Sequence, residues 1–464
     1  MVLLLFKFVC IISFNNLKYI TWETLCEGKQ KNYPHVFSDG NSSRRAQKNR
    51  PLVFLCCCVG GFMIFEIPSD VLTIIDVLEN HGHKAYIVGG CIRDMLLGIK
   101  PEDYDICTSA HPKQVQKLFE KSIPTGIAHG TVTVFVDNKP FEVTTFRVES
   151  IYTDRRHPDN VFFSNSLVED LQRRDFTINA MAYHPKQGII DPFDGSGDIK
   201  KGIIRTVGHP KERFDEDALR MLRAIRFQSR FNFSIEEKTL NAIETLSENI
   251  KDISRERILL ELNGIMLSPY PECLGKIFTT GLYSYIFPTN FPCIPDLTYL
   301  KKTPEELASR WAAFFKLTGL EDIEDIRLNC SSLKMSNNLK RDILGISKLI
   351  NKPLPNNYFL LRKALSDFGQ DLFTYALDIM KVLENNKEDI IKIEKSLREI
   401  LTEKHCISFS NMAINGTDLI STGFKPGKKL GDILSTLFIF VLQNPELNQK
   451  DNLLLFAKII DQKY

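Results

Sequence analysis

The sequence lacks the patterns that assign a structural zinc, a disulfide framework or a zinc hydrolase. Its 11 cysteines form no Cys-x-x-Cys pair, and three of them are consecutive, at positions 56–58. An odd number of cysteines without paired spacing is typical of a reduced, intracellular protein. The 9 histidines form no His-Glu-x-x-His motif. The sequence therefore offers no histidine pair for a metal site.

Charge of one sign and long apolar runs are also missing. The 59 Lys and Arg residues are nearly balanced by 57 Asp and Glu, so any nucleic-acid partner must be bound by local basic patches. The apolar runs 1–13 and 52–65 are too short to span a bilayer. We therefore expect no membrane partner and a cytoplasmic protein. Residues 1–62 are predicted to be an extension outside the folded protein, with an organelle address as the lesser alternative.

What is present is a mixed region followed by a long helical one. Residues 67–85 have the spacing and end signals of a helix, and residues 103–108 alternate like a strand. Two further apolar segments, separated by Asp-Asn-Lys, predict a β-hairpin over 130–148. From Glu212 onward almost every segment follows helical spacing. The fold class is therefore α+β, with a head built on a small mixed sheet and then an all-α neck, body and tail. The predicted boundaries are 63–195 for the head, 196–268 for the neck, 269–390 for the body and 391–464 for the tail.

Two aspartates stand one residue apart in the head. On a strand, Asp103 and Asp105 would point to the same side, and two such close negative charges repel unless a cation lies between them. Glu142, on the second strand of the predicted hairpin, can share their face. Carboxylates of this kind bind Mg²⁺ together with substrate phosphates, and three of them match a two-metal phosphoryl-transfer site.

A glycine pair precedes these aspartates. A lone Asp-x-Asp is more often a solvated strand edge or turn, but here Gly89 and Gly90 follow a predicted strand, and their backbone N–H groups can approach phosphate oxygens. Arg93 adds a cationic fork for the same triphosphate. The spacing is not Gly-x-Gly-x-x-Gly, so a dinucleotide-binding site is poorly supported. The segment predicts a nucleoside triphosphate held with its metal.

The segment GGCIRDMLLGIKPEDYDICT, residues 89–108, resembles the signature of the class II tRNA nucleotidyltransferases, or CCA-adding enzymes, and of the related bacterial poly(A) polymerases. Both belong to the polymerase-β-like nucleotidyltransferase superfamily. The resemblance runs from about Met63 to the C-terminus and is strongest between Tyr86 and Phe233. It implies template-independent addition of C, C and A to the 3′ end of tRNA from CTP and ATP, with Mg²⁺ as cofactor. The alternatives are a poly(A) polymerase, a CC-adding or A-adding enzyme, and a non-catalytic RNA-binding protein.

The segment 170–183 contains the family's Arg-Arg-Asp motif. By resemblance, Arg174 would contact the triphosphate or sugar of the incoming nucleotide. Asp175 and Asn179 would shape the same site. In isolation the two consecutive arginines could equally be a solvated basic pair.

Asp217 and Arg220 lie at i and i+3, which on a helix could be a simple surface ion pair. Counting donors and acceptors gives a sharper hypothesis. A carboxylate can accept from the amino group of cytosine or adenine while an arginine donates to the ring nitrogen, whereas uracil and guanine present the opposite pattern. The family assigns this role to its Glu-Asp-x-x-Arg motif, which Asp217 and Arg220 occupy. Arg223 and Arg226 continue the row, as nucleotide contacts by resemblance or as a phosphate-facing stripe.

Two further segments bear on the RNA. Residues 152–163 resemble the flexible loop that CCA-adding relatives need for the final A, although His157 stands where a second arginine is expected. In the tail, Lys425, Lys428 and Lys429 surround a Gly/Pro segment before a helix and resemble the part of the family that reaches tRNA. The alternative is a loop joining two helices. The sequence does not indicate an oligomeric state.

Overall fold

The computed structural model describes residues 57–59, 62–149, 161–383 and 387–463. All of them belong to one compact unit, Pro51–Tyr464. Most of the predicted extension 1–62, and most of the predicted loop 152–163 including His157, lie outside the described residues. Within the described part, no helix is both long and apolar enough to cross a membrane.

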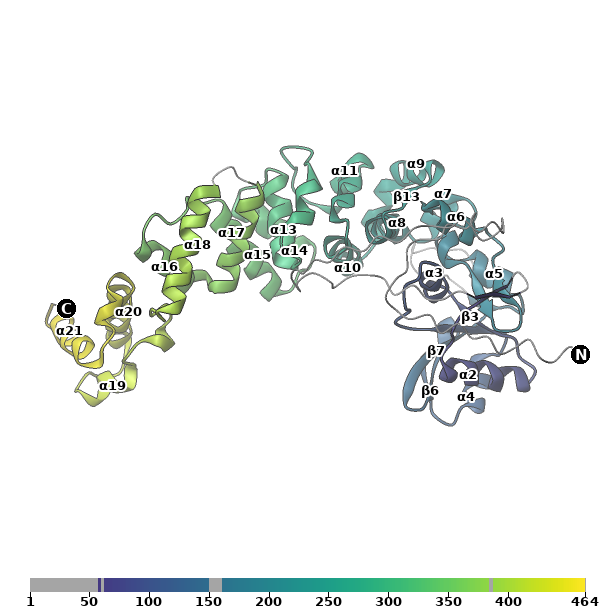
Figure 1. The fold of residues 1–464 in the computed structure, drawn as a ribbon, viewed down its shortest axis with the longest axis horizontal. Helices are drawn as coiled ribbons and strands as arrows, with labels where there is room; N and C mark the ends of the chain where they lie inside the picture. Colours follow the sequence, from purple (N-terminus) through teal and green to yellow (C-terminus); the bar gives the residue numbers. More distant parts are fainter. Residues whose placement is uncertain (1–56, 60–61, 150–160, 384–386, 464) are drawn as a thin grey trace, which may run out of the picture. The chain divides into compact units, whose positions relative to one another are not determined.

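The head is built on a mixed seven-stranded sheet with the strand order β11-β10-β3-β4-β7-β6-β5. Figure 1 labels three of its strands, β3, β6 and β7. Strand β4 lies in its middle, antiparallel to β3 and parallel to β7. The strands of this sheet are β3 (Ala85–Val88), β4 (Asp105–Thr108), β5 (Ser122–Gly126), β6 (Thr131–Val136), β7 (Lys139–Thr145), β10 (Ala182–His184) and β11 (Gly188–Ile190). The sheet places the end of β3 beside the start of β4, which positions the candidate site.

The predicted hairpin is confirmed as β6 and β7. Its two turn residues, Asp137 and Asn138, have φ of 49° and 62°. Two successive left-handed residues are the requirement of the tight turn that matches strand twist, and Asn and Asp tolerate that conformation well. The turn fixes the register of β7 and therefore the face on which Glu142 stands.

Helices and short strand pairs complete the head and its junction with the neck. The strand pairs are β1 (Cys57–Val59) with β2 (Phe62–Ile64), β8 (Arg147–Glu149) with β9 (Val161–Phe163), and β12 (Ile203–Ile204) with β13 (Ser234–Ile235). The helices are α2 (Ser69–Asn80), α3 (Gly90–Leu96), α4 (Pro112–Leu118), α5 (Leu167–Gln172) and α6 (Gly195–Lys201), with the 3-10 turns η1 (Ile127–His129) and η2 (Thr177–Asn179). The pair β1–β2 shows that the last residues of the predicted extension contact the start of the head.

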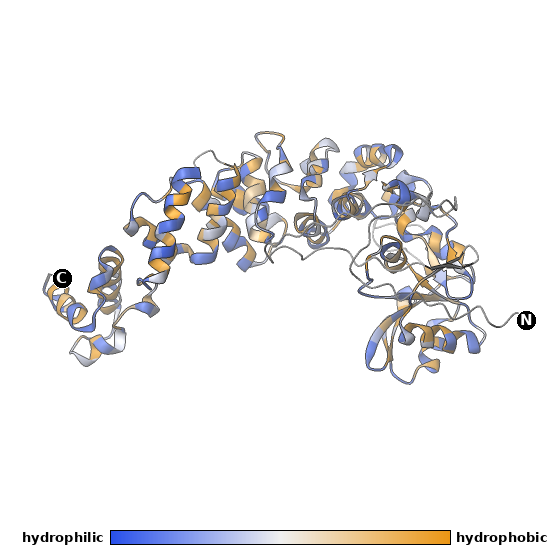
Figure 2. Cartoon of the chain, in the orientation of Figure 1, coloured by the Kyte–Doolittle hydropathy of each residue, from blue (hydrophilic) through white to orange (hydrophobic). Residues whose placement is uncertain are grey.

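Beyond the head the chain is almost entirely helical, which confirms the α+β class. The helices are α7 (Pro210–Glu216), α8 (Leu219–Phe231), α9 (Glu237–Leu246), α10 (Arg255–Met266), α11 (Lys276–Thr279), α12 (Tyr283–Ile286), α13 (Leu307–Leu317), α14 (Ile323–Ser332), α15 (Asn337–Ile350), α16 (Tyr358–Phe368), α17 (Gln370–Leu383), α18 (Lys387–Thr402), α19 (Gly416–Ser421), α20 (Lys428–Gln443) and α21 (Lys450–Lys463). Most of these helices carry apolar residues on one side and polar residues on the other (Figure 2), the pattern of helices that bury one face.

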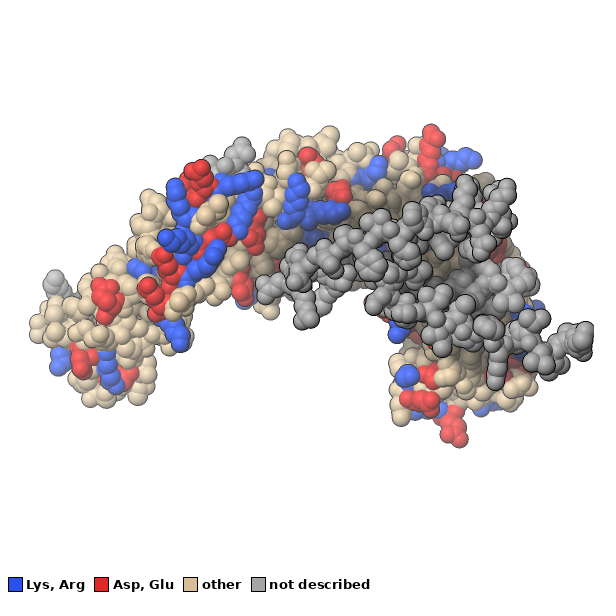
Figure 3. Space-filling model, in the orientation of Figure 1, with Lys and Arg blue, Asp and Glu red and all other residues tan. Residues whose placement is uncertain are grey.

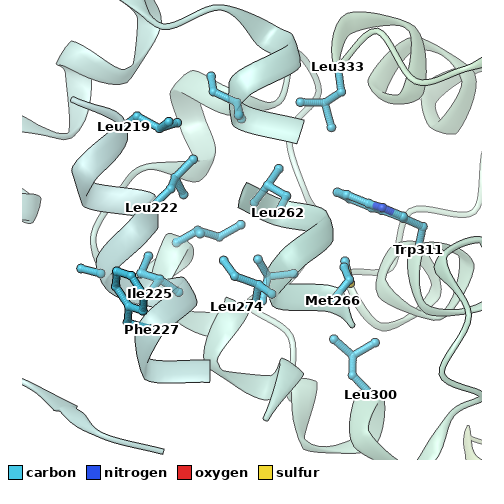
Figure 4. Close-up of a cluster of buried hydrophobic side chains, with 14 of the residues drawn as sticks. Leu219, Leu222, Ile225, Phe227, Leu262, Met266, Leu274, Leu300, Trp311 and Leu333 are labelled. Atoms are coloured by element: carbon cyan, nitrogen blue, oxygen red, sulfur yellow. The ribbon is translucent and has the colours of Figure 1, made fainter. Parts of the chain in front are cut away.

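The neck core lies between α8 and α10. Leu222 and Ile225 of α8 face Leu262 of α10, and all three are completely buried (Figure 4). Since each fully buried aliphatic side chain contributes roughly 1.5–3 kcal/mol, this contact holds the two helices firmly. The positions between these apolar residues carry the arginines of α8, which are therefore held along its polar side.

The tail has a core of its own. Ile390, Ile393, Leu397 and Ile400 of α18 pack into the large core that also serves the head, neck and body. A separate cluster begins at Cys406 and includes residues of α19, α20 and α21. The packing thus changes after α18, and the boundary at residue 391 stays a prediction.

Candidate active site

The carboxylates of the predicted metal site meet at the start of β4. The strand begins at Asp105, and Asp103 lies two residues before it, so the strand is shorter than predicted. Ile106 pairs with Val143 in parallel register, which places Asp105 beside Glu142. All three acidic side chains reach the surface.

Asp105 carries the electrostatic signature of this cluster. The pKa of its carboxyl is raised from 3.8 to about 6. Loss of water to the surrounding protein is the largest cause, and the charge of Asp103 adds to it, with a smaller part from Glu142. Arg174 opposes the shift without cancelling it. The site therefore holds negative charge that its own side chains leave uncompensated.

A divalent cation fits this donor set. Within the described ranges, no group of three or more His, Cys, Asp or Glu side chains is arranged to hold a metal ion by itself. Mg²⁺ does not require such a group, because it binds through one or two carboxylates together with water and substrate phosphates. A cation held by the hard oxygens of Asp103 and Asp105 would offset the repulsion that contributes to the raised pKa of Asp105.

The glycine at the end of β3 makes room for an arginine. Gly89 has φ of 87°, which favours glycine. A Cβ atom on it would lie 3.0 Å from Nη1 of Arg174 and 3.9 Å from Oδ2 of Asp105. The guanidinium of Arg174 therefore lies beside both the glycine backbone and the carboxylate. This is where a triphosphate bound to the metal would need a cation.

Gly90 and Arg93 lie against each other, and Arg93 is bonded to other side chains of the protein. A Cβ on Gly90 would lie 3.3 Å from Nη2 of Arg93. Arg93 is only 5% exposed. It donates from Nη1 to Asn179 at 2.6 Å and pairs with Asp94 at 2.8 Å, and it lies over the ring of Phe231. The structure thus shows Arg93 joining the head to α8, and its contact with a triphosphate stays a prediction.

Asp170 anchors both arginines of the Arg-Arg-Asp motif. Its completely buried carboxylate accepts from Nη2 of Arg173 at 2.8 Å and from Nη2 of Arg174 at 3.3 Å. Burial by itself would raise the pKa of Asp170, but the two guanidinium groups outweigh it and hold the pKa below its usual value. The arginines are therefore a fixed pair, not a solvated one.

The predicted helix through Asp217 and Arg220 is broken. Helix α7 ends at Glu216 and α8 begins at Leu219, so Asp217 lies in the joint with φ of −145°. Its Oδ1 accepts from the backbone N–H of Leu219 at 3.1 Å. A side chain that caps the start of a helix in this way competes with continued helix, which explains the break.

Asp217 and Arg220 have different partners. Asp217 accepts from Arg257, through Nη1 at 3.4 Å and Nη2 at 2.8 Å. Arg220 is 9% exposed, pairs with Glu216, and donates to the backbone carbonyl of Arg213 at 3.0 Å. The predicted surface ion pair between the two residues is replaced by two separate attachments.

Arg223 and Arg226 complete a network around Asp175. Arg223 donates from Nε to Asp175 at 2.9 Å and lies 3.7 Å from Glu261, and Arg226 lies 3.1 Å from Glu261. Burial alone would raise the pKa of Asp175, yet Arg223 and a hydrogen bond from Asn179 hold it at about 2. For Glu261, burial dominates and raises the pKa in spite of both arginines.

Sequence reasoning missed Arg257 and Glu261, both on α10. Arg257 lies 40 positions from its partner Asp217 in the chain, and no local motif links them. The available signal was helical spacing, because Arg257, Glu261 and Gly264 recur along one face of α10. Gly264 is needed there, since a Cβ on it would lie 2.8 Å from Cδ of Arg226. Glu216, the partner of Arg220, stood within the predicted motif.

The tail lysines lie at the start of α20. Lys428 and Lys429 are the first two residues of the helix, and Lys425 precedes it. All three are exposed. Lys429 is paired with Asp461 at 2.9 Å. Cations near a helix N-terminus oppose the helix dipole, so these lysines are not placed there for the stability of α20.

Three family models match the chain in succession. The Poly A polymerase head domain matches residues 85–205, which include the carboxylates and the Arg-Arg-Asp motif. The probable RNA and SrmB-binding site of polymerase A matches residues 232–291, and the putative tRNA nucleotidyltransferase domain 2 matches residues 302–457. The first match covers most of the predicted head, and the other two lie in the helical region that follows it.

Known proteins extend this result over most of the chain. The CCA-adding enzyme of Ligilactobacillus salivarius is 37% identical over 419 residues, which cover 86% of this chain and 100% of the relative. That of Pediococcus pentosaceus is 39% identical over 397 residues, covering 84% and 97%. The crystal structure of the Bacillus stearothermophilus CCA-adding enzyme in complex with CTP has a TM-score of 0.71 at 31% identity, covering 85% of this chain and 97% of that one. Sequence, fold and motif order agree, and the chain belongs to the family of CCA-adding enzymes.

Proposed function

We propose that this protein adds C, C and A to the 3′ end of tRNA, with CTP and ATP as donors and without a nucleic-acid template. Membership in the family of CCA-adding enzymes supports the reaction, and the related structure was solved with CTP. The carboxylates, the arginines beside them and the separately held Asp217 and Arg220 supply the required chemistry in one chain.

In the proposed reaction the terminal 3′ hydroxyl of the RNA attacks the α-phosphorus of the nucleotide, and the bond to pyrophosphate breaks. Bound Mg²⁺ supplies Lewis-acid chemistry to the hydroxyl and the phosphates. Asp103 and Asp105 would hold the ion, with Glu142 as the third carboxylate. Arg174, fixed by Asp170 beside Gly89, would bind the triphosphate. These residues act by positioning and by charge, which is what phosphoryl transfer requires of a protein.

Base selection is proposed to rest on Asp217 and Arg220. Each is fixed by a partner of its own, Arg257 for the carboxylate and Glu216 for the guanidinium. An acceptor and a donor held apart can meet the amino group and ring nitrogen of cytosine or adenine. This separation is the observation that carries the proposal, because the two groups are held in place by other residues and need not part from each other before they meet a base. Arg223 and Arg226 are proposed to bind the nucleotide from the same side of α8.

Two basic surfaces are proposed to contact the RNA backbone. One is formed by the exposed tail lysines Lys425, Lys428 and Lys429. The other is a groove of about 430 Å³ in the body, lined by four cations and one carboxylate: Arg327, Lys340, Arg341, Lys348 and Asp367. Over the helices α13 to α18, Figure 3 shows Lys and Arg interspersed with Asp and Glu, so binding relies on such local patches. Phosphate contacts of this kind give affinity and position without reading sequence.

The experiment is incorporation on tRNA that lacks its last three nucleotides, with Mg²⁺ and each nucleotide alone or mixed, read at single-nucleotide resolution. We expect products that stop at CCA and are built only from CTP and ATP. A long ladder of A would make the protein a poly(A) polymerase, and products ending at CC or needing CC already present would make it a CC-adding or A-adding enzyme. No extension with intact RNA binding would leave the non-catalytic alternative.

A further inference from the structure

We infer that Arg362 of α16 is a positioning residue for tRNA binding, which holds the C-terminal end of α20 and so fixes the lysines at the other end of that helix. This inference rests on the function proposed above, in which Lys425, Lys428 and Lys429 contact the RNA backbone. It adds a residue that is buried and therefore acts on the RNA only through the tail.

Helix α16 takes part in two hydrophobic cores. Leu361 and Leu365 are buried in the large core that also serves the head, neck and body. Phe359 packs against the tail cluster, which is the separate core of α19, α20 and α21. Because residues three apart lie on the same side of a helix, Phe359 and Arg362 face the tail cluster together. One side of α16 therefore attaches the tail cluster to the body.

Arg362 caps the end of α20. The residue is only 5% exposed. Its Nε donates to the backbone carbonyl of Leu442 at 2.6 Å, and its Nη2 donates to that of Gln443 at 3.1 Å. These are the last two residues of α20, and the final carbonyls of a helix have no partner within the helix. The helix dipole also favours a cation at this end, so the contact is stabilised by hydrogen bonds and by charge.

A third contact of Arg362 reaches the segment by which the chain enters the tail cluster. Its Nη1 lies 3.3 Å from Nδ1 of His405, and His405 directly precedes Cys406, the first residue of the tail cluster. One planar guanidinium therefore holds the entry of the tail cluster and the end of α20 at the same time. The rigid fork of arginine suits such a three-point contact, whereas the ammonium group of lysine is a point charge on a flexible stem.

The length of α20 connects this contact to the lysines. Lys428 begins the helix and Lys425 precedes it, whereas Arg362 holds its last two residues. Helix α20 has 16 residues, and a helix of this length spans about 24 Å. A tilt of about 10° at the held end would move the lysines by about 4 Å, which is more than the length of a hydrogen bond to a phosphate. Removal of Arg362 should therefore displace the lysines from the RNA.

The test measures the affinity for tRNA that lacks its last three nucleotides, as a function of salt, in the wild type, Arg362→Gln and Arg362→Lys. We expect Arg362→Gln to weaken binding about fivefold or more at physiological salt. It should also lower the slope of log affinity against log salt by about 1 to 2, the value of one or two phosphate contacts. Lysine keeps the charge but not the three-point hold, so Arg362→Lys should give intermediate values. Wild-type affinity and slope in Arg362→Gln would overturn the inference.

Steady-state kinetics distinguish positioning from a loss of folded protein. Partial unfolding lowers the amount of active protein, and hence the measured kcat, but leaves the salt slope of the folded fraction unchanged. Arg362→Gln should instead raise the KM for tRNA and leave the KM for CTP and kcat near their wild-type values. A lower kcat with a wild-type salt slope would show a purely structural role and would contradict the inference.

The control variant removes a positive charge from the body without touching the tail cluster. Lys392 of α18 is exposed and pairs with Asp389 of the same helix at 2.9 Å. Lys392→Gln should therefore keep the wild-type affinity and salt slope. The same loss in Lys392→Gln as in Arg362→Gln would mean that any lost charge weakens binding, and the role assigned to Arg362 would fall.

A double-mutant comparison tests whether Arg362 acts through the tail lysines. The background is the variant in which Lys425, Lys428 and Lys429 are replaced by alanine. If Arg362 acts through them, adding Arg362→Gln to this background should lower the affinity no further. An additional loss there would count against the inference.

The proposed function and this inference fail in different ways. A wild-type protein that binds tRNA but adds no CTP would contradict the function, and the binding of the variants would still decide the inference. If Arg362→Gln does not fold, Arg362→Lys carries the test, and wild-type affinity and slope in that variant overturn the three-point role.

Discussion

Two aspartates of the same chain differ most clearly in their electrostatic surroundings. Asp105 in the head has its pKa raised to about 6, whereas Asp175, in the network that joins the head to α8, has its pKa held at about 2. Neighbouring protein displaces water from both carboxylates. The difference comes from the neighbours, since Asp105 faces other carboxylates and Asp175 faces Arg223. One cluster is left with excess negative charge and the other is neutralised internally.

The carboxylate cluster around Asp105 is therefore suited to binding a cation, whereas the network around Asp175 is suited to holding side chains in position. An uncompensated carboxylate cluster is costly in the free protein and becomes favourable only when a cation binds. A compensated network is rigid and keeps its side chains in fixed orientations. The protein thus combines a carboxylate cluster left with negative charge, which is proposed to hold the metal, with an arginine network that is already fixed.

The largest expected effect follows from removing the uncompensated charge. Asp105→Ala should lower nucleotide transfer by about 10³-fold or more, because metal stabilisation of the transition state is worth several kcal/mol. Binding of tRNA should largely persist, since its phosphates are met elsewhere. Transfer and tRNA affinity are measured separately, and a variant with normal transfer would remove the metal site from this cluster.

The next effect concerns selection. Arg220→Ala should lower discrimination against UTP and GTP by about 10- to 100-fold, because a lost base contact costs about 1–3 kcal/mol. The KM for CTP should change less. Arg230→Ala is the control, because Arg230 lies on the same helix and contacts Asp94. Unchanged selectivity in a four-nucleotide competition would count against α8 as the reader.

Breaking the compensated network should reduce stability. Asp175→Asn leaves the guanidinium of Arg223 without its carboxylate and should lower the free energy of unfolding by about 3 kcal/mol, measured by denaturant titration. The lowered pKa of Asp175 stabilises the fold above pH 4, and this contribution is lost as the pH falls towards 2. Asp342→Asn, in the exposed pair with Arg341, should cost less than about 1 kcal/mol. Equal losses in the two variants would contradict the comparison.

The body groove should contribute to tRNA binding through phosphate contacts alone. Replacing Lys340 and Lys348 by alanine should weaken tRNA binding and lower the slope of log affinity against log salt by about 2. Lys113 and Lys117, exposed on α4, give a control of equal charge change. A slope that stays at the wild-type value would exclude the groove from the RNA interface.

The smallest expected effect is a gain in the stability of the metal-free protein when Asp105 is replaced by asparagine. The pKa of Asp105 is higher in the folded protein than its usual 3.8, so the folded state binds the proton more readily. The metal-free protein should therefore lose stability as pH rises from about 4 to about 6. Asp105→Asn should remove this loss and raise Tm at pH 7 in EDTA. If the Tm of the wild type and of Asp105→Asn does not change between about pH 4 and about pH 6, the raised pKa of Asp105 is contradicted.

Local patterns in the sequence predicted much of the fold and part of the candidate site. The hairpin followed from alternation and from Asp137-Asn138, and the face of β7 that carries Glu142 followed from the period of a strand. The helical region followed from its spacing. These features depend on neighbours in the chain, which is why one sequence suffices for them.

Other features depended on contacts between distant segments. The sequence predicted a fork for phosphate in Arg93, yet the fold buries it against Asn179 and α8. It also predicted one helix through Asp217, where the side chain instead caps α8. Arg257 and Glu261 had only the helical spacing of α10 as a signal, because their partners lie in distant segments of the chain.

The sequence by itself determined the groups on which the proposed function rests: carboxylates proposed for a metal, arginines proposed for phosphate, and a motif proposed to read C and A. Only the tertiary structure decided which charges are neutralised and which are left exposed to a ligand. The physical reason is that charge compensation depends on distance in space. The pairs that set it, Asp175 with Arg223 and Asp217 with Arg257, are formed by helix packing 48 and 40 positions apart in the chain.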